Sequence, residues 1–162
     1  MIEKTQNLPI RILLIEDNPG DSRLIQEMLN DADNFNFKLS IAENLVTGFL
    51  SFEESEIDIV LLDLSLPDSS GFQTIIRTRE KTINIPIIVL TSLKDETFAR
   101  KAVQAGAQDY IIKDQIESNS LVRSIYYAIE RNKMMLTIES LMGTLQKNDS
   151  QLKKIIEKNA DL

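Results

Sequence analysis

Cysteine and histidine are both absent from this chain of 162 residues. Without cysteine the chain forms no disulfide, offers no thiolate nucleophile and builds no zinc–thiolate site. Without histidine it has no imidazole base, no histidine metal ligand and no phosphohistidine of its own. Any phosphoryl group that a side chain receives must therefore arrive from outside this polypeptide.

An excess of positive charge and long apolar runs are also lacking. The formal net charge is −7 and the isoelectric point is near 4.7. This balance argues against binding to nucleic acids and to anionic membranes, which both attract Lys and Arg. No apolar stretch approaches the roughly 20 residues of a membrane span, and residues 1–9 lack the apolar centre of a secretion signal. We therefore expect a cytoplasmic protein.

Short apolar runs rich in β-branched residues recur along the chain, and each is followed by a polar residue. The runs at 11–15, 57–62, 86–90 and 109–112 are followed in turn by Glu16 and Asp17, by Asp63, by Thr91 and by Lys113. Such runs are typical of strands buried on both faces of a parallel sheet. Ligands bind outside the carboxyl ends of such strands. The sequence therefore predicts one site that holds a divalent cation and a phosphoryl group.

The segments between these runs have the periodicity of helices, and residues 35–41 alternate as a more exposed strand does. Residues 66–71 are expected to form a loop, and Gly106 stands where a C-terminal helix cap belongs. Strands that alternate with helices through short connections predict right-handed crossovers and a three-layer α/β/α sandwich.

The C-terminal part of the chain has a different pattern, with apolar residues at alternating spacings of four and three. The seam consists of Met134, Ile138, Leu141, Leu145, Asn148, Leu152, Ile155, Asn159 and Leu162. This is a heptad repeat with Asn at two core positions, and it predicts a homodimer through a long C-terminal helix of undetermined orientation. We expect a disordered N-terminus at 1–9, a domain at 10–132 and a coiled-coil extension at 133–162.

Carboxylates that lie close together repel one another and raise one another's pKa values. Mg²⁺, a hard cation with oxygen ligands, relieves this repulsion. Asp17 and Asp63 are the expected direct ligands, Glu16 acts through water, and the backbone carbonyl of Ser65 offers a further oxygen.

Asp63 is then the expected nucleophile, because the metal can hold a phosphoryl oxygen beside its carboxylate. Lys113 offers a positive charge to the same oxygens, and the Thr91 hydroxyl can donate a hydrogen bond to the product. Each residue also has a simpler interpretation: acids form turns, Thr91 with Ser92 can cap a helix, and most lysines lie at the surface. Their joint occurrence at the ends of separate strands favours the functional interpretation.

The motifs at these positions resemble the receiver domains of bacterial and archaeal two-component response regulators. The similarity runs from Ile10 to Asn132 through the segments ILLIEDNP, LLDLSLPDSSG, IVLTS and GAQDYIIK. The resemblance implies a flavodoxin-like parallel sheet of five strands in the order 2-1-3-4-5. It also implies Mg²⁺ dependence, phosphorylation of Asp63 by a sensor histidine kinase or phosphotransfer protein, and a switch pair formed by Thr91 and Tyr110.

Two positions need comment: one departs from the family pattern, and the other lies where the family often tunes dephosphorylation. Asp114 follows Lys113 where the family usually has proline, and Ser65 is small and polar where a residue often tunes dephosphorylation. Residues 121–130 resemble receivers that are joined to sensory or catalytic modules by a long helix, and residues 151–162 resemble the lead-in of a PAS sensory domain. The expected activity is at most self-phosphorylation and autodephosphorylation.

Two other functions compete with this signalling role. A metal-dependent phosphohydrolase of the haloacid-dehalogenase type needs a second Asp two residues after its nucleophile as general acid, and Ser65 occupies that position. A degenerate receiver would serve only as a protein-interaction platform, but no expected pocket residue is missing here. A nucleotide enzyme is disfavoured because no Gly-rich loop follows the first strand.

Overall fold

The computed structural model describes residues 8–92 and 94–160, and its main element is a parallel sheet. The strands are β1 (Ile10–Ile15), β2 (Phe37–Ala42), β3 (Ile59–Asp63), β6 (Ile87–Thr91) and β7 (Asp109–Ile112). Their order in the sheet is β2-β1-β3-β6-β7, and every neighbouring pair is parallel. With the strands counted within this sheet, the order is 2-1-3-4-5, so the flavodoxin-like fold expected from the sequence is confirmed.

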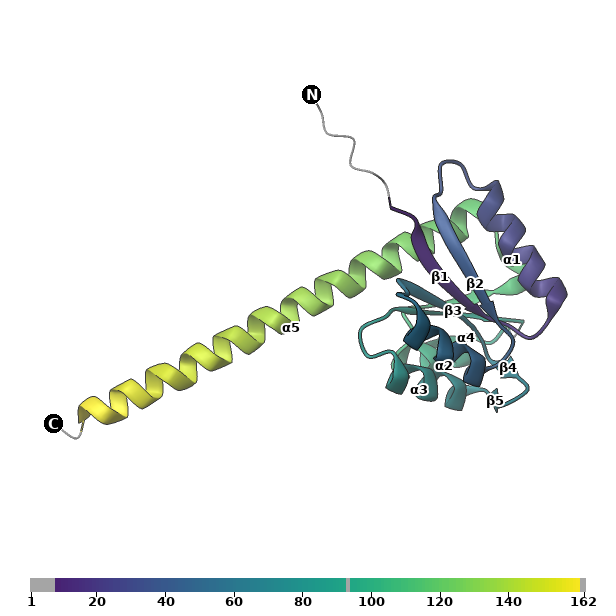
Figure 1. Cartoon of the computed structure of the whole chain (residues 1–162). Helices are drawn as coiled ribbons and strands as arrows, with labels where there is room; N and C mark the ends of the chain where they lie inside the picture. Colours follow the sequence, from purple (N-terminus) through teal and green to yellow (C-terminus); the bar gives the residue numbers. More distant parts are fainter. Residues whose placement is uncertain (1–7, 93, 161–162) are drawn as a thin grey trace, which may run out of the picture. The chain divides into compact units, whose positions relative to one another are not determined.

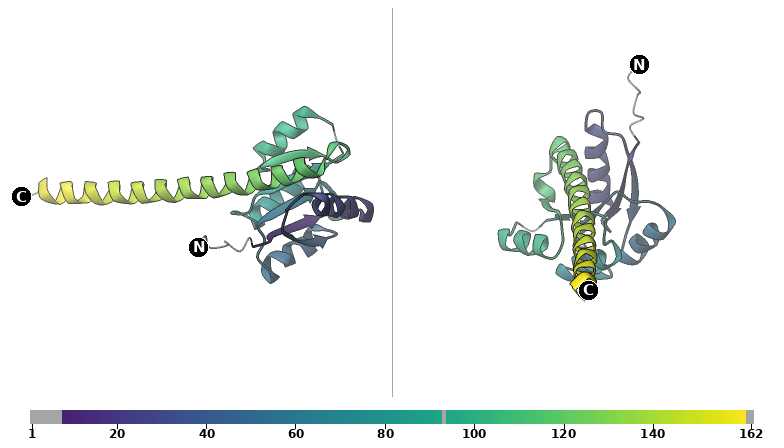
Figure 2. Two further views of the ribbon diagram at one scale, coloured as in Figure 1. Left: turned by 90° about the horizontal axis from the view of Figure 1, so that it is seen from above. Right: turned by 90° about the vertical axis from the view of Figure 1, so that its left-hand side faces the viewer.

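Helices cover both faces of the sheet (Figures 1 and 2). They are α1 (Pro19–Asp31), α2 (Leu45–Glu54), α3 (Phe72–Lys81), α4 (Glu96–Gln104) and α5 (Ser118–Ala160). Leu13 and Ile15 belong to a hydrophobic cluster that includes residues of α2, α3 and α4. Ile12 and Leu14, whose side chains point the opposite way along the same strand, belong to a second cluster with residues of α1 and the first part of α5. The α/β/α layers therefore follow from the alternation along each buried strand.

Polar side chains fix where the helices begin. The Asn18 side chain accepts hydrogen bonds from the backbone N–H groups of Gly20 and Asp21 at the start of α1, and Pro19 is its first residue. Asp95 caps α4 by accepting from the N–H groups of Thr97 and Phe98. Thr91 is therefore not the cap of α4, and the simpler interpretation of that residue is wrong.

The connection after β3 differs from the loop expected at 66–71. It contains a short antiparallel hairpin of β4 (Ser65–Leu66) and β5 (Ser69–Ser70). The Gly71 N–H, donating to the Leu64 carbonyl at 2.9 Å, closes the hairpin, and Gly71 has a φ of 62°. Strands of two residues are too short for their alternation to stand out in a sequence.

Gly106 ends α4 as expected. Its φ is 112°, a conformation that L residues rarely adopt, and an added Cβ would lie 3.1 Å from Nε of Arg79. The Arg79 guanidinium donates to the Gly106 carbonyl at 2.6 Å. Glycine is thus required at position 106 both by the backbone conformation and by the close approach of Arg79.

The chain divides into two compact units, Met1–Ile129 and Glu130–Leu162. In the first unit, α5 buries Leu121, Ile125 and Ala128. In the second unit the predicted helix continues to Ala160, and the apolar seam residues from Met134 to Ile155 are each more than half exposed. The expected disorder at 1–9 falls mainly on residues 1–7, which lie outside the described residues, as does Leu162. Among the described residues, the helices are too short or too polar for a membrane span.

Candidate functional site

Three acidic side chains meet at the carboxyl ends of β1 and β3, which are neighbours in the sheet. Oxygen atoms of Glu16, Asp17 and Asp63 all lie within 4.8 Å of one another. Glu16 and Asp63 are 1% and 5% exposed, whereas Asp17 is exposed to solvent. The expected convergence of these acids is therefore present.

The ammonium group of Lys113 lies among these acids and is itself buried. Its Nζ is 2.5 Å from Oε2 of Glu16, 2.8 Å from Oδ2 of Asp21 and 3.2 Å from Oδ1 of Asp63. Lys113 begins the short 3-10 helix η1 (Lys113–Gln115) directly after β7. The amine expected at this edge of the sheet thus faces three carboxylates.

Burial and charge pull the pKa values of this group in opposite directions. Burial raises the pKa of Glu16 and of Asp63, and the hydrogen bonds and positive charge of Lys113 offset this only in part. Burial lowers the pKa of Lys113, but hydrogen bonds to Asp21 and Glu16 outweigh it and leave that pKa above its usual value. The amine is therefore positively charged at neutral pH, and the buried carboxyls are costly to ionise without a further cation.

The donor set fits a hard divalent cation. All three convergent groups are carboxylates, the ligands that Mg²⁺ prefers. The pKa values of Glu16 and Asp63 stay raised even beside Lys113, so a further cation would stabilise their ionised forms. The backbone N–H of Ser65 lies 3.3 Å from Oδ2 of Asp63. Glu16, Asp17 and Asp63 could therefore hold Mg²⁺.

Thr91 and Tyr110 are coupled to each other beside this cluster. Thr91 is the last residue of β6 and is buried, and its side chain shares a hydrogen bond with the Tyr110 hydroxyl. Burial raises the pKa of Tyr110, so its hydroxyl stays protonated at neutral pH. The Tyr110 ring lies 5.9 Å from that of Phe98, which stacks on Phe72 at 4.3 Å. A row of aromatic rings thus runs from α3 through α4 to β7.

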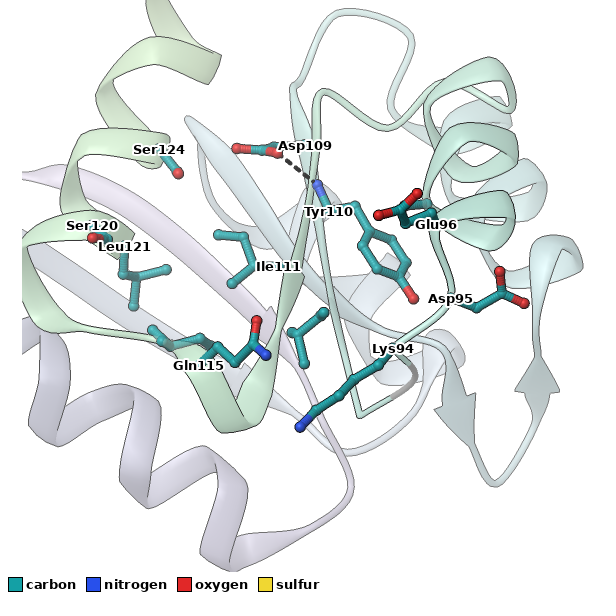
Figure 3. Close-up of a pocket in the computed structure, with 13 residues that line it drawn as sticks. Lys94, Asp95, Glu96, Asp109, Tyr110, Ile111, Gln115, Ser120, Leu121 and Ser124 are labelled. Atoms are coloured by element: carbon teal, nitrogen blue, oxygen red, sulfur yellow. Dashed lines mark hydrogen bonds between the residues drawn. The ribbon is translucent and has the colours of Figure 1, made fainter.

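A cavity of about 570 Å³ is lined by Tyr110 and by other residues of α4, β7 and the start of α5. Figure 3 shows the Tyr110 ring pointing toward the segment that contains Asp95 and Glu96, while Leu121 and Ser124 line the opposite wall. The Asp109 carboxylate accepts a hydrogen bond from the Tyr110 N–H at 2.8 Å. Tyr110 thus interacts with Thr91 and also lines this cavity.

Sequence reasoning did not assign two carboxylates that matter here. Asp21 follows the first apolar run by several residues and received no role, yet its carboxylate contacts Lys113; a helix that begins at Pro19 places it in the first turn, near the same sheet edge. Asp68 accepts hydrogen bonds from the N–H groups of Leu45 and Val46 at 3.0 and 3.1 Å, which ties the hairpin to the start of α2. Burial raises the pKa of Asp68, but these donors outweigh it and hold that pKa low.

The departure at Asp114 has a visible local result. Its Oδ2 lies 3.9 Å from Nζ of Lys94, and both side chains are more than half exposed. Exposed pairs of this kind contribute little. With Asp114 in place of the usual proline, Lys113 still contacts Glu16 and Asp63.

Residues 12–126 match the family model of the response regulator receiver domain. The chain belongs to this family.

Known relatives agree with this assignment. The chain is 33% identical over 118 residues to the transcriptional activator protein IrlR of Burkholderia pseudomallei, covering 72% of this chain and 50% of the relative. A receiver domain of a putative LuxO repressor protein from Vibrio parahaemolyticus is 26% identical, with a TM-score of 0.68, covering 82% of this chain and 98% of that one. The Mn²⁺-bound response regulator Rcp1 is 27% identical, with a TM-score of 0.58, covering 72% and 90%. The chain spans about half the length of the curated relatives it matches.

Proposed function

We propose that Asp63 accepts a phosphoryl group from a sensor histidine kinase or a phosphotransfer protein. The observation that carries this proposal is a buried carboxylate held between the Lys113 ammonium at 3.2 Å and two further acids. A carboxylate in this setting is poised to be a nucleophile, since the charge it would gain on phosphorylation already has a cation beside it. The absence of histidine fits a chain that receives the group rather than generates it.

In this reaction an oxygen of Asp63 attacks phosphorus in line with the leaving nitrogen. The bond from phosphorus to the donor's histidine breaks as the bond to the Asp63 oxygen forms. Lys113 pairs with the transferred phosphoryl oxygens, and Glu16 and Asp17 bind the cation together with Asp63. Mg²⁺, when bound, supplies positive charge that offsets both the acids and the transferred group; the Mn²⁺ bound to the related regulator Rcp1 supports a divalent cation here. The remaining activity is self-phosphorylation from small phosphodonors and autodephosphorylation.

Thr91 and Tyr110 form the proposed switch. A phosphoryl group carries a charge of about −1.5 to −2, and the Thr91 hydroxyl at the end of β6 is an expected hydrogen-bond donor to it. If Thr91 turns toward the phosphoryl oxygens, its hydrogen bond with Tyr110 must rearrange. The Tyr110 ring also borders the cavity between α4 and α5, so the change alters the surface from which α5 starts.

The C-terminal helix is the proposed output and dimerisation element. Its apolar seam residues are more than half exposed in the unit 130–162, and an apolar stripe at heptad spacing is stabilised by a second helix of the same kind. We favour a parallel, in-register pair, because Asn148 and Asn159 then each face their own counterpart and can hydrogen-bond. In an antiparallel pair, heptad positions of different kinds face each other, so the two Asn residues are matched only in the single register that places Asn148 opposite Asn159. The PAS lead-in expected at 151–162 lies beyond the family match, which ends at residue 126, and stays a prediction.

Intact-mass measurement tests the phosphorylation. The protein is incubated with acetyl phosphate and Mg²⁺, and the expected result is a mass gain of one phosphoryl group that is absent with EDTA and absent in Asp63→Asn. Lack of any gain in the unsubstituted protein would instead favour the interaction platform. Steady release of phosphate from small esters would favour the phosphohydrolase.

Single cysteines test the dimer cleanly, because the chain has none of its own. Under oxidation, Leu145→Cys is expected to form a disulfide-linked dimer, since seam residues of a parallel in-register pair meet their own counterparts. The control is Ser150→Cys, on the opposite side of the helix, which should remain monomeric on a denaturing gel. Equal cross-linking at both positions, or none at Leu145, would contradict the proposed pairing.

A further inference from the structure

The ammonium of Lys113 contacts three carboxylates. Two of these partners, Glu16 and Asp63, belong to the cluster that could hold a cation. The third, Asp21, does not: its carboxylate lies 2.8 Å from the ammonium and belongs to the first turn of α1. Asp21 is therefore a fourth acid of the pocket with a separate relation to the lysine.

The position of Asp21 is fixed by the start of its helix. Asn18 caps α1 and accepts from the Asp21 N–H at 3.1 Å, and Pro19 is the first helical residue. An acid in the first turn also interacts favourably with the helix dipole. The backbone that carries the carboxylate is thus fixed independently of Lys113.

A lysine ammonium has only three donors, and a phosphoryl group on Asp63 needs at least one of them. Its arrival therefore puts the phosphoryl oxygens and the Asp21 carboxylate in competition for the same ammonium. Asp21 also adds a negative charge to a pocket that must attract a dication before it receives an anion. The competition for Lys113 opposes binding of the phosphoryl group, whereas the added negative charge favours binding of the cation.

We infer that Asp21 is a positioning residue that holds Lys113 toward α1, favouring cation binding and opposing retention of the phosphoryl group. This inference rests on the proposed function of Asp63. With Asp21 present, Lys113 is shared, so Glu16 and Asp63 are freer to bind the cation. When Asp21 is neutralised, the Lys113 ammonium interacts more strongly with Glu16, Asp63 and any phosphoryl oxygens.

The substitution Asp21→Asn separates these effects, because the amide keeps the shape and loses the charge. Mg²⁺ affinity is measured by titration calorimetry, and the affinity for beryllium fluoride, a mimic of the phosphoryl group, is measured at saturating Mg²⁺. Because the Asp21 side chain is 37% exposed, solvent screens its interaction with Lys113 and limits its effect on either ligand. We therefore expect Mg²⁺ to bind about two- to fivefold more weakly and beryllium fluoride about two- to fivefold more tightly.

Two variants serve as controls. Asp31→Asn removes an equal charge from the exposed last residue of α1 and should change neither affinity. Asp21→Glu retains the charge, and both affinities of this variant should be close to those of the unsubstituted protein. If Asp21→Asn fails to fold, Asp21→Ser gives the same comparison.

The opposite directions of the two shifts decide the matter. If both affinities fall together, Asp21 merely shapes the pocket, and if neither changes, Asp21 has no influence on the site; either result overturns the inference. Both results leave the proposed function standing as long as the unsubstituted protein binds beryllium fluoride and gains a phosphoryl group. Should the unsubstituted protein do neither, the proposed function itself fails.

Discussion

Replacing Lys113 with methionine removes the buried cation of the pocket and keeps a side chain of similar length. Glu16 and Asp63, which are 1% and 5% exposed, then lose a partner at 2.5 and 3.2 Å respectively. Removing one partner of a buried ion pair costs about 3–5 kcal/mol, because an uncompensated charge remains. With a urea m value of about 2 kcal/mol/M, the unfolding midpoint should fall by about 2 M.

The loss of stability in Lys113→Met should depend on pH. Burial already raises the pKa values of Glu16 and Asp63 with the ammonium present, and both rise further without it. The folded variant then binds protons more tightly than its unfolded chain. The deficit relative to the unsubstituted protein is therefore largest above the folded pKa values, and it shrinks as the pH falls through them toward the ordinary carboxyl range.

Urea unfolding followed by far-ultraviolet circular dichroism at pH 8 and pH 5, without Mg²⁺, measures this deficit. The double variant Lys113→Met with Asp63→Asn is the control, and it should recover part of the stability because one buried acid is now neutral. A deficit of equal size at both pH values, or a Lys113→Met variant as stable as the unsubstituted protein, would refute the role of Lys113 as the counter-ion of these acids.

Three further predictions concern elements around the pocket. Gly106→Ala should cost about 1–2 kcal/mol in urea unfolding, because φ is 112° there and L residues pay this amount in left-handed conformations; an unchanged midpoint would contradict the strain. Asp68→Ala should lower the unfolding free energy by about 1 kcal/mol, because the N–H groups of Leu45 and Val46 in the first turn of α2 lose their acceptor, with the exposed Asp33→Ala as the comparison. Tyr110→Phe should gain the phosphoryl group normally but lose any phosphorylation-dependent change in Leu145→Cys cross-linking; a change that persists would remove Tyr110 from the switch.

The fold could be predicted because its strands are buried on both faces. The run before Asp63 is apolar from Ile59 to Leu62, and β3 is buried along its whole length. The ends of such runs also located the acids and Lys113, since parallel strands present their carboxyl ends at one edge. The prediction therefore succeeded where a residue's place depends on strand position alone.

The features that the sequence did not reveal depend on helix register and on short local structure. Asp21 contacts Lys113 only because α1 begins at Pro19, and a shift of one residue would turn its side chain by about 100°. The hairpin of β4 and β5 consists of two-residue strands, for which no periodicity can be recognised. Asp95 rather than Thr91 caps α4. The sequence did not decide between them, because several polar residues precede this helix. The domain boundary at 132 and the cytoplasmic location stay predictions.

Locating the phosphoryl group within the chain tests the central claim most directly. After incubation with acetyl phosphate and Mg²⁺, borohydride reduces an aspartyl phosphate to homoserine, and peptide sequencing by mass spectrometry then identifies the modified residue. We predict homoserine at position 63 alone. Modification at Glu16, Asp17 or a residue outside the pocket, with position 63 unchanged, would contradict the account.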